Sequence, residues 1–466
     1  MQFRKHVGTA RFYRGALALA VPVMLQSLLQ NLVSLIDNFM VAGLGDIKMS
    51  GVNVLNQVLF VFFVALMTLA GAGGMFMSQF NGAKDSAGMK QVFRFKILGG
   101  LALTAVVTAL SLTVPDAIIG LLLNSNTERA AISAQAKDYL SIIVWTFVPM
   151  VFSMMIGSSF REIGKVRPPL IISVASTVVN TFFNWVLIYG NLGAPRLEVR
   201  GAAIATVIAR LVEMTAFIVY AKRANPEFWV PLRDFFKVNL RIFVTMLRKS
   251  AALFAGEMSW VLTETVMTAV YNGRGGSEIV SGMAAGWAIA NLFFLVFNGI
   301  HTSVGVTVGG TLGRNELEKA QEEARWLRSG SIVAGVAVAL LEVGSVLLIP
   351  VVFGNLSAGS RAVTRDMLLV ISCYMPAWTY LNSQFATARA GGDAKFGLWV
   401  DVSVNLALFL PGIFLLAALT DYGPIRMYAI VKLTDIVKIA IAAWQLKTGR
   451  WIRNIAHEHA QEVTPA

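Results

Sequence analysis

The stretch ALALAVPVMLQSLLQNLVSLIDNFMV, residues 16–41, decides the fold. It is long enough to form a helix that crosses the hydrocarbon core of a bilayer, which takes about 20 apolar residues. Asp37 carries the one charged side chain in it. The stretch is too long for a cleaved signal peptide and lacks a small-residue cleavage site. It therefore predicts a membrane-spanning helix.

The same kind of stretch recurs along the chain. We expect twelve spanning helices, near residues 16–41, 52–78, 97–114, 139–158, 169–189, 201–220, 251–271, 282–308, 331–353, 367–388, 396–419 and 427–446. Of the 466 residues, 56% are hydrophobic and 14% are charged. So few charges do not cover the surface of a soluble protein. The alternating pattern of a membrane β-barrel is absent, so we expect an all-α membrane protein.

The net charge of +13 has an uneven distribution along the chain. Lys and Arg favour alternate predicted loops by about three to one, which is the positive-inside pattern. This pattern predicts a bacterial-type inner membrane protein with both termini in the cytoplasm, and it explains the basic composition without a nucleic-acid partner. Cys373 is the single cysteine, which excludes a disulfide framework.

The two halves of the chain resemble each other. Gly45–Gly51 has a counterpart in Gly276–Gly282, and Arg161–Lys165 has one in Arg389–Asp393. Six spans in each half predict parallel repeats related by an axis along the membrane normal. Because one chain then holds a complete two-lobed unit, we expect a monomer. The predicted domains are an N-lobe at 1–220, a cytoplasmic linker at 221–250 with an amphipathic helix over 235–247, a C-lobe at 251–446 and a cytoplasmic tail at 447–466.

Asp37 is the most informative charge inside a predicted span. An ionisable side chain at the middle of a span costs about 2.5–3.5 kcal/mol on insertion scales. A carboxyl group there either binds a cation or is protonated, unless it lies at the outer interface at the end of its helix. In the fifth span, Asn180 and Asn184 lie on one helix face, and Thr206 of the sixth offers a hydroxyl.

We therefore predict a cation-coupling site at Asp37, Asn180, Asn184 and Thr206. Asp37 and the two asparagines would be ligands for Na⁺ if the ion is sodium; the same groups suit a protonated Asp37 if it is H⁺. Hydrogen bonding between helices is the alternative role of the asparagines, and spacing alone favours it.

The second half contributes three acids as candidates for substrate binding. Glu257 and Glu264 share a face of the seventh span, and Asp401 lies in the eleventh. Glu257 is close enough in sequence to Arg248 and Lys249 to pair with either of them instead.

Other charges within spans have simpler explanations. Arg210 pairs with Glu213 at a spacing of three, and the twelfth span offers similar pairs among Lys432, Asp435 and Lys438. Glu342 has no local partner, and we expect His301 to be a hydrogen-bonded core residue.

No enzymatic motif accompanies these features. The chain has no Walker motif, zinc-binding cluster, Ser/His/Asp arrangement or Gly-rich nucleotide loop. We therefore expect a protein that is not an enzyme and has no cofactor other than a coupling ion.

Several motifs, in their order, resemble those of the multidrug and toxic compound extrusion (MATE) family. They are Pro22 followed by Asp37–Gly45, the Asn180/Asn184 pair before Ile188–Gly190, Gly201–Thr206, Arg389–Asp393 and Gly449–Trp451. The resemblance extends over essentially the whole chain and implies two six-helix lobes. It also implies an antiporter that exports cationic, amphiphilic drugs or metabolites while Na⁺ or H⁺ moves inward.

The resemblance assigns roles to individual residues. Asp37 matches the coupling carboxylate of the N-lobe, and Asn180 and Asn184 match its polar partners, although some branches have an aspartate in place of Asn184. A cation-binding glutamate of some members falls at Val261, and an aspartate of the tenth span falls near Trp378. The resemblance thus implies coupling in the N-lobe and leaves the C-lobe acids as substrate contacts.

Three other classes of protein compete with this interpretation. A flippase for lipid-linked oligosaccharides has a related two-lobed bundle, but favours a cationic cavity. A major-facilitator carrier has the same helix count, but its basic signature is missing from the loop Asn81–Ser86. A membrane scaffold without transport activity leaves Asp37 unexplained.

Overall fold

The computed structural model describes residues 7–122 and 129–458, and these residues form helices and turns without a β-strand. The all-α fold class is confirmed. Residues 1–6 of the predicted N-lobe and residues 459–466 of the predicted cytoplasmic tail lie outside the described residues. The described chain falls into two compact units. We call residues 25–77 and 85–250 the N-unit, and residues 7–24, 78–84 and 251–458 the C-unit.

Three helices contribute residues to both units: α1 (Ala10–Ala42), α2 (Asp46–Ala83) and α9 (Leu240–Asn272). The N-unit also contains α3 (Ser86–Thr113), α4 (Pro115–Leu122), α5 (Arg129–Ile143), α6 (Phe147–Glu162), α7 (Arg167–Tyr189) and α8 (Glu198–Ala224). The C-unit also contains α10 (Ser277–Phe293), α11 (Val296–Gly313), α12 (Leu317–Ser345), α13 (Ile349–Val352), α14 (Ala358–Ala390), α15 (Lys395–Val404), α16 (Leu410–Leu419), α17 (Pro424–Lys432) and α18 (Thr434–Lys447). Short 3-10 turns lie at Val144–Thr146, Asn191–Gly193, Leu232–Asp234 and Val346–Leu348, and a π-helical turn at Asn405–Phe409.

Within the described residues, nine helical segments are long and apolar enough to cross a membrane. They are Ala10–Val41, Asp46–Ala83, Ser86–Thr113, Arg129–Glu162, Arg167–Tyr189, Glu198–Ala224, Ser277–Gly313, Leu317–Val352 and Lys395–Leu419. The other three predicted spans are helical but do not meet both criteria. Helices α9 and α14 are each 33 residues long and carry several charges, and the twelfth span is broken into α17 and α18 at Leu433. The count of twelve spans therefore stays a prediction.

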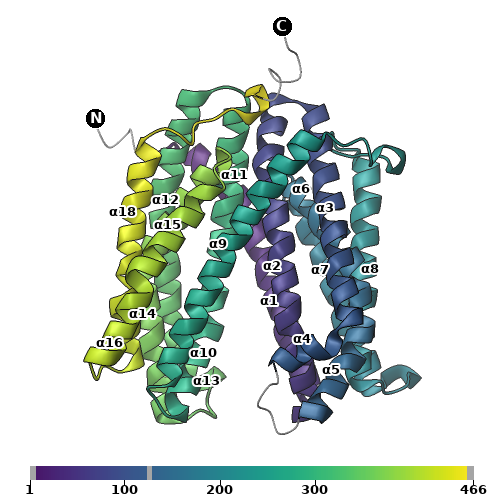
Figure 1. Ribbon diagram of the computed structural model, residues 1–466, viewed down its shortest axis with the longest axis vertical. Coiled ribbons are helices and arrows are strands. Elements are labelled where there is room, and N and C mark those ends of the chain that lie inside the picture. The colour runs from purple at the N-terminus through teal and green to yellow at the C-terminus, as the bar shows by residue number, and fades with distance from the viewer. Residues whose placement is uncertain (1–6, 123–128, 459–466) are drawn as a thin grey trace. The chain divides into compact units, whose positions relative to one another are not determined.

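In the N-unit, α8 is the central helix. It packs along α7 and also contacts α5 and α6, and Figure 1 shows α7 and α8 running side by side. A small residue makes the close approach to α7 possible, because a Cβ added at Gly201 would lie 2.5 Å from the carbonyl oxygen of Leu187. Gly201, the first residue of the motif Gly201–Thr206, is therefore needed for the close packing of α8 on α7.

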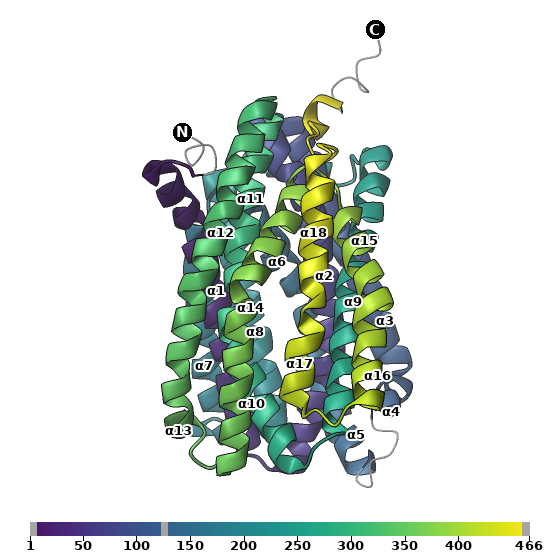
Figure 2. The same ribbon diagram turned by 90° about the vertical axis from the view of Figure 1, so that its left-hand side faces the viewer.

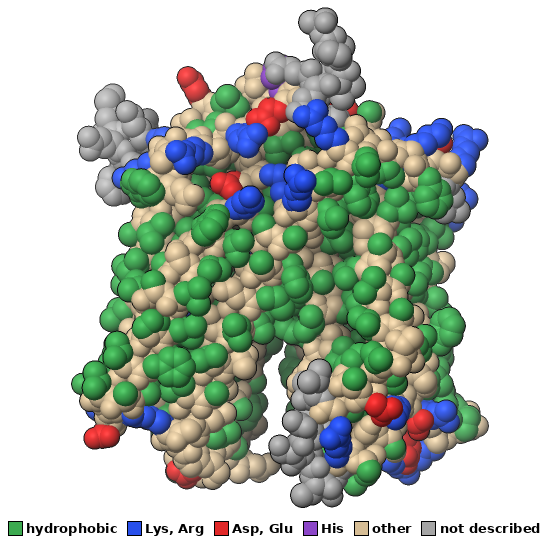
Figure 3. Space-filling view, in the orientation of Figure 1, with side chains coloured by type: hydrophobic (Ala, Val, Ile, Leu, Met, Phe, Trp, Pro, Cys, Tyr) green, Lys and Arg blue, Asp and Glu red, His purple; other side chains and the backbone are tan. Residues whose placement is uncertain are grey.

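In the C-unit, α14 is the central helix and contacts α10, α11, α12 and α18. It contains Pro376. Figure 2 shows α17 and α18 following each other end to end. Leu433 separates the two helices in the chain. On the face of this unit drawn in Figure 3, apolar side chains cover the middle of the helices, and most visible Lys and Arg side chains lie toward the helix ends. This distribution suits a helical protein surrounded by lipid.

The segment 235–247 does not form a separate helix. Residues 235–239 are turn and coil, and α9 begins at Leu240 and continues to Asn272. The side chain of Asn239 stabilises this start, because its Oδ1 accepts hydrogen bonds from the backbone nitrogens of Arg241 and Ile242, at 3.1 and 3.3 Å. The amphipathic pattern therefore belongs to the first turns of a longer helix.

Replacing Gly201 by alanine tests the packing of α7 on α8. We expect Gly201→Ala to destabilise the purified protein by about 1–3 kcal/mol, because its Cβ overlaps backbone atoms that cannot rotate away. Gly305→Ala is the matched control, since a Cβ at Gly305 has nothing within 4 Å. Thermal unfolding followed by size-exclusion chromatography measures both variants, and equal midpoints would contradict the packing argument.

Candidate functional site

Asp37 of α1 meets the asparagine pair of α7 inside the N-unit. The Nδ2 of Asn184 donates hydrogen bonds to Oδ1 of Asp37 at 2.5 Å and to Oδ1 of Asn180 at 3.2 Å. Both asparagines are buried, and Asp37 is half-buried. The Oδ1 of Asn184 is buried and has no hydrogen-bond partner among the described residues. The structure thus brings together three of the four predicted coupling residues, with an amide oxygen left over.

The local sequence of α7 explains how the amides are placed. The helix begins at Arg167 with prolines in its first turn and ends at Tyr189, and the following Gly190 caps it with a left-handed φ of 78°. Between these ends, Ser173, Ser176, Asn180 and Asn184 are buried at helical spacing and form one polar stripe. Ser176 Oγ donates to the carbonyl of Ala209 on α8 at 3.0 Å, so the stripe faces α8.

Thr206 does not join this group. Its hydroxyl donates to the carbonyl of Ala202 on its own helix, at 3.0 Å. A threonine in a helix readily makes this bond to the preceding turn, which removes its hydroxyl hydrogen from any other acceptor. The predicted role of Thr206 in cation coupling therefore receives no support from the hydrogen bonds of this structure.

Arg210 and Glu213 of α8 extend the polar group. Arg210 donates to Oε2 of Glu213 at 2.7 Å, as the spacing predicts, and its charge also acts on Asp37. Glu213 accepts a hydrogen bond from Ser173 at 3.4 Å, and Ser173 accepts one from Gln26 at 2.8 Å. Polar side chains of three helices are thus joined from α1 through α7 to α8. Sequence reasoning missed Gln26 and Ser173, because neither carries a charge that would be costly in a span.

A buried ion pair lies elsewhere in the N-unit. Lys96 of α3 contacts Glu162 at the end of α6, and it also donates to the hydroxyls of Ser158 and Ser159 at 3.1 and 3.3 Å. The Lys96 side chain is fully buried, although Lys96 precedes the predicted third span, which starts at residue 97. The apolar residues Phe93, Phe95 and Ile97 around it were the signal that the helix already includes this position.

The three C-unit acids are each paired with a base. Glu257 pairs with Arg389 of α14 at 3.5 Å, a partner that lies far from it along the chain. Glu264 pairs with Lys432 of α17 at 2.6 Å. Helix packing thus selected partners that local spacing does not reveal.

Asp401 belongs to a second buried group of charges. Lys438 of α18 lies 3.3 Å from Asp401 and 3.1 Å from Asp435, which confirms the pairing expected within α18. Trp378 donates its Nε1 hydrogen to Asp435 at 2.8 Å. Trp378 lies near the position at which the resemblance places an aspartate of the tenth span. In the structure its indole is hydrogen-bonded to Asp435 of α18.

His301 differs from expectation, whereas Glu342 lacks a hydrogen-bond partner, in agreement with its isolated position in the sequence. His301 interacts with the backbone of Asn382, but its Nε2 is buried without a partner among the described residues, so it is not fully hydrogen-bonded. Both carboxyl oxygens of Glu342, which is fully buried, also lack a hydrogen-bond partner there. Such orphaned atoms are costly in a core and point to a proton or a ligand.

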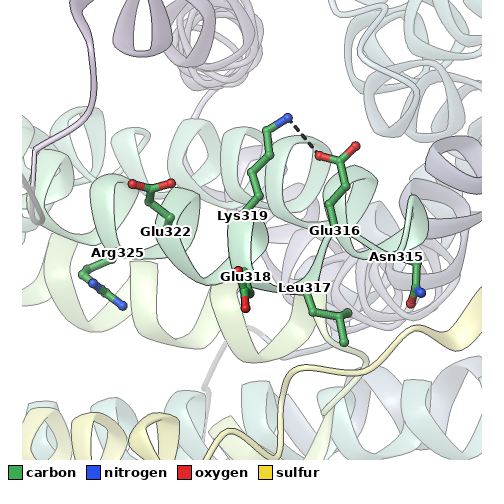
Figure 4. Close-up of a pocket in the computed structure, with 7 residues that line it drawn as sticks. All are labelled: Asn315, Glu316, Leu317, Glu318, Lys319, Glu322 and Arg325. Carbon is green, nitrogen blue, oxygen red and sulfur yellow. Dashed lines mark ion pairs between the residues drawn. The ribbon is translucent and has the colours of Figure 1, made fainter.

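Within the described residues, no group of three or more His, Cys, Asp or Glu side chains is arranged to hold a metal ion. A cation at Asp37 would therefore rely on amide oxygens. A surface pocket of the C-unit lies elsewhere, at the start of α12 (Figure 4). It is lined by Asn315, Glu316, Leu317, Glu318, Lys319, Glu322 and Arg325. An ion pair of 2.9 Å joins Glu316 to Lys319 there, and this hydrogen bond lowers the pKa of Glu316.

The family model of MatE matches residues 22–186 and 253–414, which is most of the chain and includes Asp37, both asparagines and all three C-unit acids. The chain belongs to the MatE family. The family is one of transporters, so the expected resemblance is confirmed and the expectation that the chain is not an enzyme agrees with it.

Two bacterial proteins illustrate the similarity of this chain to known multidrug transporters. A probable multidrug resistance protein NorM of Bradyrhizobium diazoefficiens is 26% identical over 425 residues, which cover 88% of each chain. The multidrug export protein MepA of Staphylococcus saprophyticus is 28% identical over 271 residues, which cover 58% of each. This protein is thus a multi-pass membrane protein with bacterial relatives.

Solved MATE structures share the fold. A mutant of the Vibrio cholerae transporter VcmN has a TM-score of 0.82 at 16% identity, covering 95% of this chain and 99% of that one. A MOP superfamily transporter of Pyrococcus furiosus, described as having a binding pocket of reverse polarity, has a TM-score of 0.81 at 18% identity, covering 94% and 96%.

The buried Lys96–Glu162 pair yields a stability test of this MatE protein. We expect Lys96→Met to destabilise it by about 3–5 kcal/mol, because the change leaves the Glu162 carboxylate without its closest cation. Lys137→Met is the control: it removes a lysine from the exposed pair with Asp116, where screening by water makes the loss small. Thermal unfolding in detergent compares the two. Equal losses would show that Lys96 does not stabilise the fold through its charge.

Proposed function

We propose that this protein is a secondary active antiporter that exports organic compounds while a cation moves inward. The observation that carries the proposal is the carboxyl group of Asp37, held by the amide of Asn184 at 2.5 Å inside a helix long enough to span a membrane. Membership in MatE and the names of relatives such as NorM and MepA support export of several drugs.

Asp37 is suited to coupling because its hydrogen-bond partner is a neutral amide. An ionised Asp37 carries a charge that a Na⁺ ion or a proton neutralises. The Asn184 side chain donates to the carboxylate, and its free oxygen accepts from a protonated carboxyl or contributes to a Na⁺ ion after a small rotation. The coupling group is therefore Asp37, Asn180 and Asn184, and the ion is Na⁺ or H⁺.

Transport requires that the two ligands stabilise different conformations. Cation binding at Asp37 would favour the conformation that releases the organic compound outside, and release of the cation inside would complete the cycle. Alternating access of this type needs a differential affinity and no covalent step. The protein acts as a monomer in the bacterial inner membrane, with both termini in the cytoplasm.

The charge of the exported compound is a separate part of the proposal. We propose cationic or amphiphilic compounds. Of the three acids predicted as substrate contacts, Glu264 and Asp401 are already paired with buried lysines, and we propose Glu257 as the acid that contacts the compound. Glu257 is the most accessible of the three, since its side chain is 42% exposed against 16% and 22%. The Pyrococcus furiosus transporter of similar fold is described as having a binding pocket of reverse polarity. The charge of the exported compound is therefore measured separately from coupling. A lipid-linked oligosaccharide is the alternative substrate.

Replacing Asp37 tests the coupling site. In proteoliposomes with an imposed Na⁺ or H⁺ gradient, we expect wild-type protein to move a fluorescent organic cation, and Asp37→Asn to abolish this movement because it removes the ionisable group. The gradient that drives transport identifies the ion. Asp46→Asn is the matched control: it makes the same chemical change at an exposed position at the start of α2, and should transport at the wild-type rate.

Two outcomes would contradict the proposal in different ways. Gradient-driven transport by Asp37→Asn at the wild-type rate would show that coupling occurs elsewhere. No movement of any organic cation by the wild-type protein under either gradient would remove drug export, and lipid-linked oligosaccharides would then be tested as the substrate.

A further inference from the structure

The ammonium group of Lys432 lies in a cage inside the C-unit. Its Nζ is 2.6 Å from Oε1 of Glu264 and 5.2, 5.5 and 5.8 Å from the ring centroids of Phe409, Tyr428 and Trp378. The Lys432 side chain is 8% exposed. A carboxylate and three aromatic faces around one nitrogen form the arrangement by which proteins bind ammonium ligands. Here the protein's own lysine occupies it.

Phe409 and Tyr428 are fully buried or nearly so, and Trp378 is anchored by its hydrogen bond to Asp435. The cage walls therefore come from α9, α14, the π-helical turn and α17, which are four separate segments of one unit. Because packing fixes each ring, we expect the walls to keep their positions when the lysine is shortened.

Several polar atoms around the cage can still form hydrogen bonds. The second oxygen of Glu264 and the hydroxyls of Tyr271 and Tyr428 are buried without a hydrogen-bond partner among the described residues. The rings of Tyr271 and Tyr428 pack edge to face at 6.3 Å, so both hydroxyls belong to this region. One ammonium group does not satisfy all these atoms, and burying them unsatisfied is costly. The surroundings are those of a ligand site rather than of a simple ion pair.

We propose that the Lys432 ammonium is a tethered cation that fills an ammonium-binding site of the C-unit and closes it to free cations. The class of ligand that the vacated site would take is a small primary alkylammonium ion. Lys432 is thus a specificity-determining residue: with it in place, Glu264 is neutralised from within the fold. This inference does not depend on coupling at Asp37, because it concerns binding to the purified protein.

Chemical rescue of Lys432→Ala tests the inference. The change removes the ammonium group and most of its stem and leaves an acidic, aromatic-walled cavity. We expect ethylammonium to raise the unfolding midpoint of the purified full-length variant by roughly 2 °C or more, in proportion to the logarithm of its concentration. Ethanol, which has a similar size and no charge, should leave the midpoint unchanged, and neither compound should shift the wild-type protein.

Two further variants make the test specific. The double variant Lys432→Ala with Glu264→Gln keeps the cavity without its carboxylate, and should lose the response to ethylammonium. Lys438→Ala removes the neighbouring lysine that pairs with Asp401 and Asp435, and leaves the cage filled, so it should not respond. A response of Lys438→Ala equal to that of Lys432→Ala would show nonspecific binding and overturn the inference.

If Lys432→Ala does not fold in the absence of ethylammonium, the inference can still be tested. In that case the variant is produced with ethylammonium in the medium and during purification, and recovery of monodisperse protein supports the inference. The double variant has no uncompensated carboxylate in the cage and should fold without the ion. If the double variant folds while ethylammonium neither rescues nor stabilises Lys432→Ala, the inference is wrong; an equal midpoint shift in the wild-type protein would also overturn it.

Discussion

A charge inside a membrane-spanning helix must be compensated within the protein, because lipid offers it no partner. Two pairs of buried charges meet this constraint by joining different helices, Lys96 with Glu162 and Lys432 with Glu264. Each pair joins two helices, and a helix face that presented either residue elsewhere would leave a buried charge without its partner.

Asp37 meets the same constraint in another way. Its closest partner is the neutral amide of Asn184, while Arg210 is already engaged by Glu213. An ion pair neutralises a carboxylate permanently, whereas an amide leaves its charge available to a proton or a metal cation. The N-unit thus holds a carboxyl group that can exchange its cation, and the C-unit holds acids whose cations belong to the chain. This difference is the physical basis of the functional proposal.

Irregularities of the helices coincide with these charges. Lys432 is the last residue of α17, directly before the break at Leu433, and Phe409 ends the π-helical turn. In a regular helix these two side chains would point in other directions. A helix ends or bulges more readily where tertiary contacts compensate for the lost backbone hydrogen bonds. The predicted twelfth span is one continuous stretch in the sequence, whereas in the structure it is broken directly after Lys432, the residue that pairs with Glu264.

The sequence by itself determined the properties that depend on local composition and spacing. Apolar length predicts spanning helices, an unpaired Asp37 predicts a site, and the spacing of Asn180 and Asn184 predicts their common face. Contacts between distant helices decided the rest: the pairing of Glu257 with Arg389, the burial of Lys96 and the hydrogen bond of Asn184 to Asp37. A sequence shows which charges need a partner in the membrane, but the partner is chosen by the packing of helices, which no local pattern encodes.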